Sequence, residues 1–290
     1  MVSSQSINNA FYFTKYGSGA CCVFLPGMGW SGMEGLNIAQ SLASERTTYL
    51  LDLPGAGRSE RIGGRVTWQS IGQWLNTFAN EVSPDEPVDV IGHSIGGLIG
   101  LAFANTYPHK VRRLVLLDTA YRNWPRFLPE VPAPVRYLVP ILSLAVRIWG
   151  ENAYAVFGSG DDTAKEVRQE DFDTAVAHTT ARFGIPDSPH LRAALKDPVT
   201  TPGNAMAGLV MAIYQTHHER ELLRVSVPTM VVYGQRSGAD ALKIHRQIER
   251  LSRSRAPLTL VSAQGAHYVH WSDSHHVLSV VKTFLTQDDL

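Results

Sequence analysis

Short apolar runs rich in β-branched and aromatic residues recur along the chain and predict strands. Several of these runs are continuous rather than alternating, which is typical of strands that are covered on both faces. Between them lie stretches in which apolar residues repeat at helical spacing. This alternation predicts an α/β fold with a mostly parallel sheet flanked by helices. The predicted strands are Phe11–Tyr16, Cys21–Leu25, Thr47–Leu51, Val88–Ile91, Arg113–Leu117, Thr229–Tyr233 and Pro257–Val261, and the predicted helices are Met33–Ser44, Trp68–Val82, Ile95–Tyr107, Leu242–Ser252 and His275–Leu285.

The alternation of strand and helix stops between residues 121 and 225. That stretch opens with four closely spaced prolines and continues as helices interrupted by Gly and Pro, without a convincing strand. The strand pattern then resumes and finishes the chain. We therefore predict a core of residues 1–120 and 226–290, with residues 121–225 inserted as a helical cap over the edge where open α/β sheets bind ligands. An independent helical domain is the less favoured alternative.

Composition and charge argue against several classes of partner. The chain has 290 residues, with 26 Lys and Arg against 26 Asp and Glu, so its formal net charge is zero. Because a neutral chain has no electrostatic attraction for nucleic acid or an anionic membrane, we expect neither as a partner. The longest apolar stretch, Tyr137–Val146, is too short to span a bilayer. Residues Met1–Asn9 lack the apolar region of a signal peptide. We expect a cytoplasmic protein, whose oligomeric state is unknown.

The strongest chemical motif is Gly92-His93-Ser94-Ile95-Gly96. It matches G-x-S-x-G and has the required context, a predicted strand before it and an apolar helix after it. Such a sharp corner holds the serine in a strained conformation, and glycines at the flanking positions leave room for neighbouring backbone. The amino end of the helix offers free N–H groups and a positive dipole to an anion. Ser94 is therefore the predicted nucleophile, and the alternative is a Gly-rich turn before an ordinary helix.

With this motif the chain resembles the α/β-hydrolase fold family, in particular its cap-bearing serine esterases, along nearly its whole length. Residues 25–29, Leu-Pro-Gly-Met-Gly, resemble the family's oxyanion loop, with Pro26 in place of the usual His. Residues 52–59, Asp-Leu-Pro-Gly-Ala-Gly-Arg-Ser, resemble the loop after the next strand, in which Asp52 has a structural role. Residues 265–271, Gly-Ala-His-Tyr-Val-His-Trp, resemble the segment that carries the catalytic histidine.

The resemblance implies a base and two backbone donors. Acyl transfer needs two N–H groups directed at the developing oxyanion. The family pattern assigns one to Ile95, directly after the nucleophile, and the other to Met28 in the Gly-rich loop. His267 is the expected general base, because it lies between the last strand and the last helix, where the family has its base. His270 is expected to pack or cap locally.

The acid of the catalytic triad is harder to assign. The family usually carries it after the strand that follows the cap, as Gly-x-x-Asp, but this chain has Ser237 at that position. A serine cannot balance the charge of an imidazolium. Asp118 ends a predicted strand at a place where some family members carry their acid, and Asp240 lies three residues beyond the usual position. We favour Asp118, with Asp240 and a purely local turn role of Asp118 as alternatives.

The resulting prediction is a serine hydrolase that cleaves a carboxylic ester, or a similar acyl bond, of a small and rather apolar substrate. A serine nucleophile disfavours the haloalkane dehalogenases and epoxide hydrolases of this fold, which use Asp. A lactonase and a carbon–carbon bond hydrolase stay open, as does a non-hydrolytic ligand-binding protein on the same scaffold. The adjacent pairs His217-His218 and His275-His276 lack the spacing of a helical metal site, so we expect no metal and no organic cofactor. Glu34 and Glu60 are predicted to be solvated. Apolar residues from Trp124 to Trp149 are expected to pack within the cap and in part to line its entrance.

Overall fold

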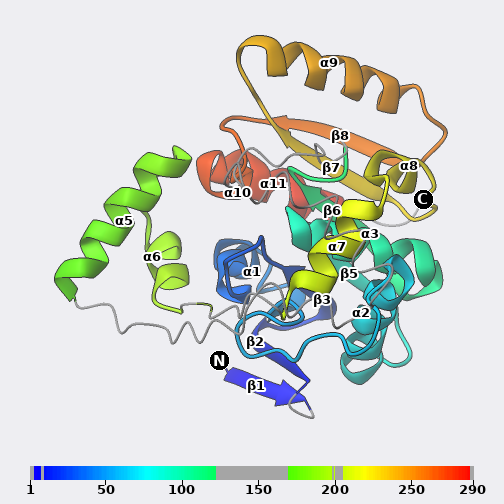
Figure 1. Cartoon of the computed structure of the whole chain (residues 1–290), viewed down its shortest axis with the longest axis horizontal. Helices are drawn as coiled ribbons and strands as arrows, with labels where there is room; N and C mark the ends of the chain where they lie inside the picture. Colours follow the sequence, from blue (N-terminus) through cyan, green and yellow to red (C-terminus); the bar gives the residue numbers. More distant parts are fainter. Residues whose placement is uncertain (1–2, 8–9, 122–168, 198, 200–204, 288–290) are drawn as a thin grey trace.

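One eight-stranded sheet organises the molecule (Figure 1). The structure is a computed structural model that describes residues 3–7, 10–121, 169–197, 199 and 205–287. The strand order is β1-β2-β4-β3-β5-β6-β7-β8, in which the β1–β2 and β2–β4 pairs are antiparallel and the other pairs are parallel. The predicted fold class is therefore confirmed. The strands are β1 (Ser3–Ile7), β2 (Phe11–Gly17), β3 (Ala20–Leu25), β4 (Arg46–Leu51), β5 (Val88–His93), β6 (Val111–Leu117), β7 (Thr229–Gly234) and β8 (Leu258–Ala263).

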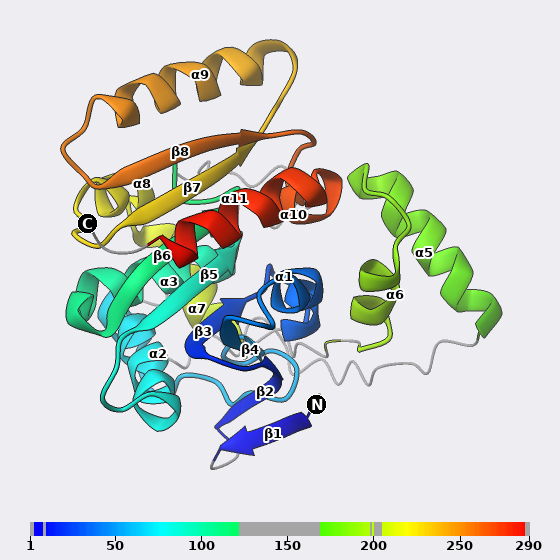
Figure 2. The same cartoon turned by 180° about the vertical axis from the view of Figure 1, so that it is seen from behind.

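Helices cover both faces of the sheet (Figures 1 and 2). Residues of α2, α3, α7 and α8 share one buried cluster with the strands, and residues of α1 and α11 share the cluster on the opposite face. The helices are η1 (Gly32–Gly35), α1 (Leu36–Ser41), α2 (Trp68–Val82), α3 (Ile95–Thr106), η2 (Pro108–Lys110), α5 (Gln169–Phe183), α6 (Pro189–Leu195), α7 (Ala207–Gln215), α8 (His218–Leu223), α9 (Gly238–Ser252), α10 (Val269–Ser272) and α11 (Ser274–Thr286).

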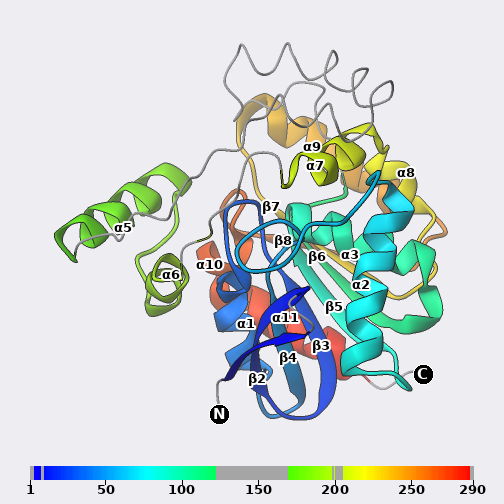
Figure 3. The same cartoon turned by 60° about the horizontal axis from the view of Figure 1, so that its bottom comes forward.

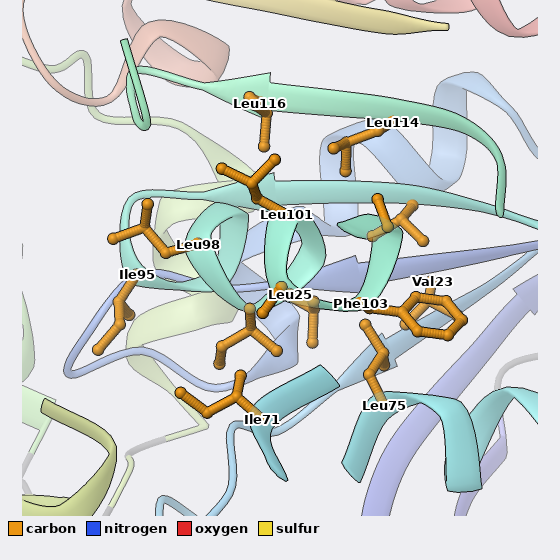
Figure 4. Close-up of a cluster of buried hydrophobic side chains, with 14 of the residues drawn as sticks. Val23, Leu25, Ile71, Leu75, Ile95, Leu98, Leu101, Phe103, Leu114 and Leu116 are labelled. Atoms are coloured by element: carbon orange, nitrogen blue, oxygen red, sulfur yellow. The ribbon is translucent and has the colours of Figure 1, made fainter. Parts of the chain in front are cut away.

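Alternation along β3 explains the two cores. Val23 and Leu25 are fully buried against α2 and α3, in the cluster that Figure 4 displays. Cys22, which precedes Val23, and Phe24, which lies between Val23 and Leu25, belong to the cluster on the other face. Successive side chains of a strand point to opposite faces, so one apolar run serves both layers. The sheet is therefore buried on both sides, as the continuous apolar runs predicted.

Two of the differences from the sequence prediction concern the first quarter of the chain. The expected helix Met33–Ser44 is divided into η1 and α1, and Gly35 lies at the junction, where a Cβ would collide with the ring of Phe24. Strand β1 was not predicted, because its sequence Ser-Ser-Gln-Ser-Ile is almost entirely polar. It pairs antiparallel with β2 at the edge of the sheet, where backbone hydrogen bonds suffice to order a polar strand.

In the described parts of the segment between β6 and β7, the regular secondary structure is helical. α7 contacts α2, and α8 contacts α3 on the core. α5 and α6 lie beside the sheet, with α6 against η1 and α1 (Figure 3). The apolar residues from 124 to 149 lie outside the described residues, so the expectation for them is untested. Within the described ranges, no helix combines the length and the apolarity that crossing a membrane requires.

Candidate active site

The predicted site residues follow strands that end at one edge of the sheet. The register pairs Leu25 of β3 with Gly92 of β5, and His93 of β5 with Leu117 of β6. Gly234 of β7 pairs in turn with Ala263 of β8. The loops that follow these five strands therefore meet above the carboxyl edge of the sheet. They carry Met28, Ser94, Asp118, Arg236 and His267.

Ser94 occupies a strained corner between β5 and α3. Its φ of 51° and ψ of −120° lie in a region that residues with a side chain rarely adopt. The corner is possible because its neighbours are glycines: a Cβ on Gly96 would collide with the carbonyl of Leu25, and one on Gly92 with the backbone of Gly97. The loop after β3 is therefore in direct contact with the first turn of α3.

Ser94, His267 and Asp118 form one hydrogen-bonded chain. The Ser94 hydroxyl lies 3.0 Å from His267 Nε2, and His267 Nδ1 lies 2.7 Å from Asp118 Oδ2. With the ring protonated on Nδ1, the imidazole donates to Asp118 and accepts from the serine. This is the arrangement in which a histidine can remove a proton from a hydroxyl while a carboxylate holds its tautomer.

Asp118 is held in place by four donors. Its carboxylate is fully buried, and its φ of 47° turns the chain sharply after β6. Oδ1 accepts from the N–H of Gly234 at 3.1 Å and from the hydroxyl of Tyr121 at 2.7 Å. Oδ2 accepts from Arg236 Nη2 at 2.6 Å as well as from His267. These four contacts hold the carboxylate in place beside the His267 ring.

The environment keeps the His267 imidazole neutral. Burial lowers its pKa below the ordinary value for histidine, and the positive charges of His93 and Arg236 lower it further. The hydrogen bond from the ring to Asp118 acts in the opposite direction without overcoming this effect. A neutral imidazole near neutral pH is the form that a general base requires.

The two expected oxyanion donors lie on neighbouring segments. Ile95 is the first residue of α3, where the backbone N–H has no partner within its own helix. Met28 lies in the loop after β3, with 46 % of its surface exposed. A Cβ on Gly96 would also contact the carbonyl of Pro26, so this loop and the start of α3 are in direct contact.

Glu34 was predicted to be solvated, and this prediction is wrong. Its side chain is fully buried, with Oε1 2.6 Å from His93 Nδ1 and Oε2 accepting from the Gly27 N–H at 2.5 Å. Glu34 is buried because folding brings it beside His93, which lies 59 positions further along the chain and balances its charge. Glu60 is exposed, as predicted.

Three further predictions concern Asp52, His270 and Asp240. Asp52 accepts from the backbone N–H groups of Gly32 and Arg58 at 2.9 and 3.1 Å, in agreement with its structural role. His270 is fully buried and its ring packs 5.0 Å from that of Trp271, so it packs locally as predicted. Asp240, the alternative acid, belongs to α9, and its side chain lies outside the described part of the structure.

Sequence reasoning missed Arg236. It lies in the segment where an acid was sought, and it places a cation on the acid of the preceding strand. The signal was a basic residue directly before Ser237, the position at which the expected carboxylate is absent. Among the described residues, Glu34, His93 and His270 also form a group whose ligand atoms lie within 4.8 Å of one another. Metal binding by this group is considered below.

Comparisons with known proteins identify relatives of this chain. A methyl ester esterase acting on pimeloyl-[acyl-carrier protein], from Salmonella newport, is 32% identical over 129 residues. That match spans 42% of this chain and about half of the relative, 48% of its length. Similar solved structures include the thioesterase domain of the curacin biosynthetic pathway, with 17% identity and a TM-score of 0.67 over 99% of both chains. They also include the enol-lactonase of Burkholderia xenovorans LB400, with 20% identity and a TM-score of 0.65 over 98% of this chain and 100% of that one.

At such identities the solved structures establish the fold alone. The family model of the alpha/beta hydrolase fold matches residues 23–274, a range that includes Ser94, Asp118 and His267. The chain belongs to the α/β-hydrolase family.

Proposed function

We propose that this hydrolase cleaves a carboxylic ester, or a similar acyl bond, through an acyl-enzyme on Ser94. The observation that carries the proposal is the hydrogen-bonded chain from the Ser94 hydroxyl through His267 to the buried carboxylate of Asp118. The esterase among the relatives supports an ester as the substrate class. The zero net charge of the chain provides no general attraction for a charged substrate, which favours a small and rather apolar one.

The proposed reaction has two steps. Ser94 Oγ attacks the carbonyl carbon while its proton passes to His267 Nε2, and the oxyanion is held by the N–H groups of Met28 and Ile95. The alkoxy group leaves as an alcohol and takes the proton from His267. Water then gives a proton to His267 while its oxygen bonds to the acyl carbon. The bond from that carbon to Ser94 Oγ breaks and Oγ takes the proton back from His267, which releases the acid and restores both residues.

We also propose that residues 121–225 form the cap that selects the substrate. The support comes from α5 to α8, which fill the described parts of this segment without a strand. Phe183 and Leu191 of this segment pack with Trp30 and Tyr268, beside the oxyanion loop and the base. A cap in contact with both loops is suitably placed to shape the acyl pocket.

A lactonase is the second candidate, since a lactone is an internal ester and the enol-lactonase shares this fold. It uses the same attack and differs only in that the alcohol stays attached to the product. A carbon–carbon bond hydrolase and a non-hydrolytic ligand-binding protein are the remaining alternatives. The cytoplasmic location stays a prediction from the sequence.

Turnover of p-nitrophenyl acetate, butyrate and octanoate by the wild type and by Ser94→Ala tests the proposal. The wild type is expected to exceed the variant by at least a thousandfold, and a fluorophosphonate probe is expected to label Ser94 in a mass-spectrometric digest. A panel of lactones then separates the two ester chemistries. Equal turnover by both proteins, with no labelled serine, would leave the ligand-binding alternative.

A further inference from the structure

A buried carboxylate joins the oxyanion loop to the nucleophile strand. Glu34 lies in η1, and its side chain is fully enclosed. Oε2 accepts from the N–H of Gly27, next to Met28, while Oε1 lies 2.6 Å from Nδ1 of His93, the residue before the nucleophile. The proposed mechanism above gives no role to either Glu34 or His93.

The other nitrogen of His93 reaches the loop of the base. Nε2 lies 3.0 Å from the backbone carbonyl oxygen of His267, and the two imidazole rings are 4.6 Å apart between their centroids. A continuous path therefore runs from Gly27 through Glu34 and His93 to His267. It connects three of the loops that the proposed reaction uses.

The hydrogen-bonding partners of His93 define its charge. A neutral imidazole has one N–H, but both ring nitrogens of His93 face acceptors, the Glu34 carboxylate and the His267 carbonyl. The contact of Nε2 is a hydrogen bond, and the contact of Nδ1, which lacks hydrogen-bond geometry, is favourable as an ion pair when the ring carries two protons and a positive charge. A buried carboxylate likewise needs an opposite charge beside it.

The neighbouring ionisable groups agree with this assignment. Burial opposes charge on both partners, yet their mutual attraction leaves the pKa of Glu34 lowered and that of His93 raised. His270, whose Nε2 lies 3.5 Å from Glu34, stays neutral, because burial and the charge of His93 lower its pKa to about 3. Tyr268, with its ring 5.0 Å from that of His93, has a raised pKa and also stays neutral.

The other charges that act on these histidines are those of Asp118 and of Arg236, its ion-pair partner. Asp118 raises the pKa of His93, and Arg236 and His93 both lower that of His267. The pair therefore places a cation 4.6 Å from the base, measured between the ring centroids.

We propose that Glu34 and His93 form a buried carboxylate–imidazolium pair that positions the oxyanion loop and the base loop and places a positive charge beside His267. This inference rests on the proposed hydrolase function. Glu34 and His93 are positioning residues in this scheme, because both are enclosed and neither contacts the reacting atoms.

A metal ion is the competing explanation for Glu34, His93 and His270. Two ligand atoms on a tetrahedral zinc ion lie about 3.3 Å apart, given metal–ligand distances near 2.0 Å. The separation of 2.6 Å between Glu34 Oε1 and His93 Nδ1 is shorter than that and is the distance of a direct ion pair. The observed spacing therefore favours an ion pair over a bound metal ion. Zinc that copurifies at one ion per chain, with Tm falling after dialysis against EDTA, would overturn the pair.

Glu34→Gln isolates the charge of the pair. The amide oxygen can still accept from Gly27, and the amide N–H₂ can donate to Nδ1 of a neutral His93, which still donates to the His267 carbonyl. Every hydrogen bond has a counterpart, and only the two charges disappear. Glu34→Ala removes the connection as well. Asp89→Asn is the matched control, because Asp89 is also a fully buried, ion-paired carboxylate but lies at the amino end of β5.

The pH dependence of kcat/KM for p-nitrophenyl butyrate separates these variants. In Glu34→Gln the acidic limb is expected to move to higher pH by about one pH unit, because the base loses a neighbouring cation. Its kcat on the plateau and its KM should stay within about threefold of the wild type. Glu34→Ala should lower kcat by about tenfold to a hundredfold with little change in KM, since the pair orients groups without contacting substrate. If the acidic limb of Glu34→Gln coincides with that of Asp89→Asn, the proposed positive charge beside His267 is wrong. If folded Glu34→Ala has an unchanged kcat, the proposed positioning of the two loops by the pair is wrong.

Nitrogen-15 NMR of the wild-type histidine rings provides a test that needs neither a variant nor activity. His93 is expected to have two protonated nitrogens at pH 7.5, when His267 has one. A neutral His93 at that pH would overturn the pair even if the enzyme is an esterase. Failure of the proposed hydrolase function is recognised separately, by a wild type that neither turns over esters nor reacts with the fluorophosphonate probe.

Discussion

Arg236 and His267 contact the same carboxylate oxygen: Oδ2 of Asp118 lies 2.6 Å from Arg236 Nη2 and 2.7 Å from His267 Nδ1. The acid therefore faces a permanent cation and an imidazole at once. Since the Arg236 side chain is only 18 % exposed, water screens its charge weakly. The cation opposes protonation of His267.

Replacing Arg236 should therefore change the pH dependence of the proposed reaction. In Arg236→Met the pKa of His267 rises, so a larger fraction of the base is protonated at a given acidic pH and the acidic limb of kcat/KM moves to higher pH. Activity on the alkaline side of that limb should change much less. Arg253→Met, which removes an exposed arginine paired with Glu249, is the control and should keep the wild-type profile. A shift to lower pH would contradict the sign of this electrostatic effect.

The assignment of the acid is tested by exchanging each candidate for its amide. Asp118→Asn should lower kcat for p-nitrophenyl butyrate by about 10³–10⁴-fold, because an amide cannot stabilise the imidazolium that forms as Ser94 attacks. Asp240→Asn should stay within about twofold of the wild type. Circular dichroism checks that both variants are folded. The opposite ranking would transfer the role of the acid to Asp240.

The contact between α3 and the oxyanion loop should be sensitive to a single methyl group. Gly96→Ala places a Cβ against the carbonyls of Leu25 and Pro26, so either the loop moves or the helix shifts. We expect a loss of about 1–3 kcal/mol in the free energy of unfolding together with a lower kcat. Urea titration and ester kinetics measure the two effects.

Gly63→Ala is the matched control for that substitution. Nothing lies within 4 Å of a Cβ at Gly63, so its stability should change by less than about 0.5 kcal/mol. Equal losses from both substitutions would indicate a general effect of alanine rather than the predicted collision.

A buried ion cluster at the opposite edge of the sheet should affect stability alone. Asp89 is fully buried, 2.7 Å from Nε of Arg46 and 2.8 Å from Nη2 of Arg112. Asp89→Asn leaves two arginines without their buried counter-charge and should cost about 3–5 kcal/mol of unfolding free energy. Urea denaturation measures this, with the exposed Glu249→Gln expected to cost less than about 1 kcal/mol. A parallel fall in kcat would show that the two edges of the sheet are coupled.

The fold was predictable wherever one local pattern determined the element. α2 has the bounds that its apolar spacing predicted, from Trp68 to Val82, with Thr67 and Ser70 forming a reciprocal cap at its start. β1 was not predictable, because its polar sequence is ordered only by pairing with β2. Backbone pairing of that kind leaves no trace in side-chain periodicity.

The candidate site divides in the same way. Ser94 was indicated by a motif whose residues are adjacent in sequence, and His267 by the resemblance of the segment around it to the family's histidine segment. Glu34 and Arg236 owe their positions to partners that are 59 and 118 residues away, His93 and Asp118. A charge whose partner is found only after folding is indistinguishable in the sequence from a solvated one, and this is why Glu34 was misassigned.

The position of Asp118 directly after β6 has a consequence for how this hydrolase can be altered. In the proposed mechanism, the turn from β7 into α9 supplies no reacting atom, although it carries Arg236. Exchange of that one side chain can therefore retune the working pH while the nucleophile, the base and the acid all keep their places. Directed evolution toward acidic or alkaline conditions can therefore act on position 236 without changing a residue that takes part in the reaction.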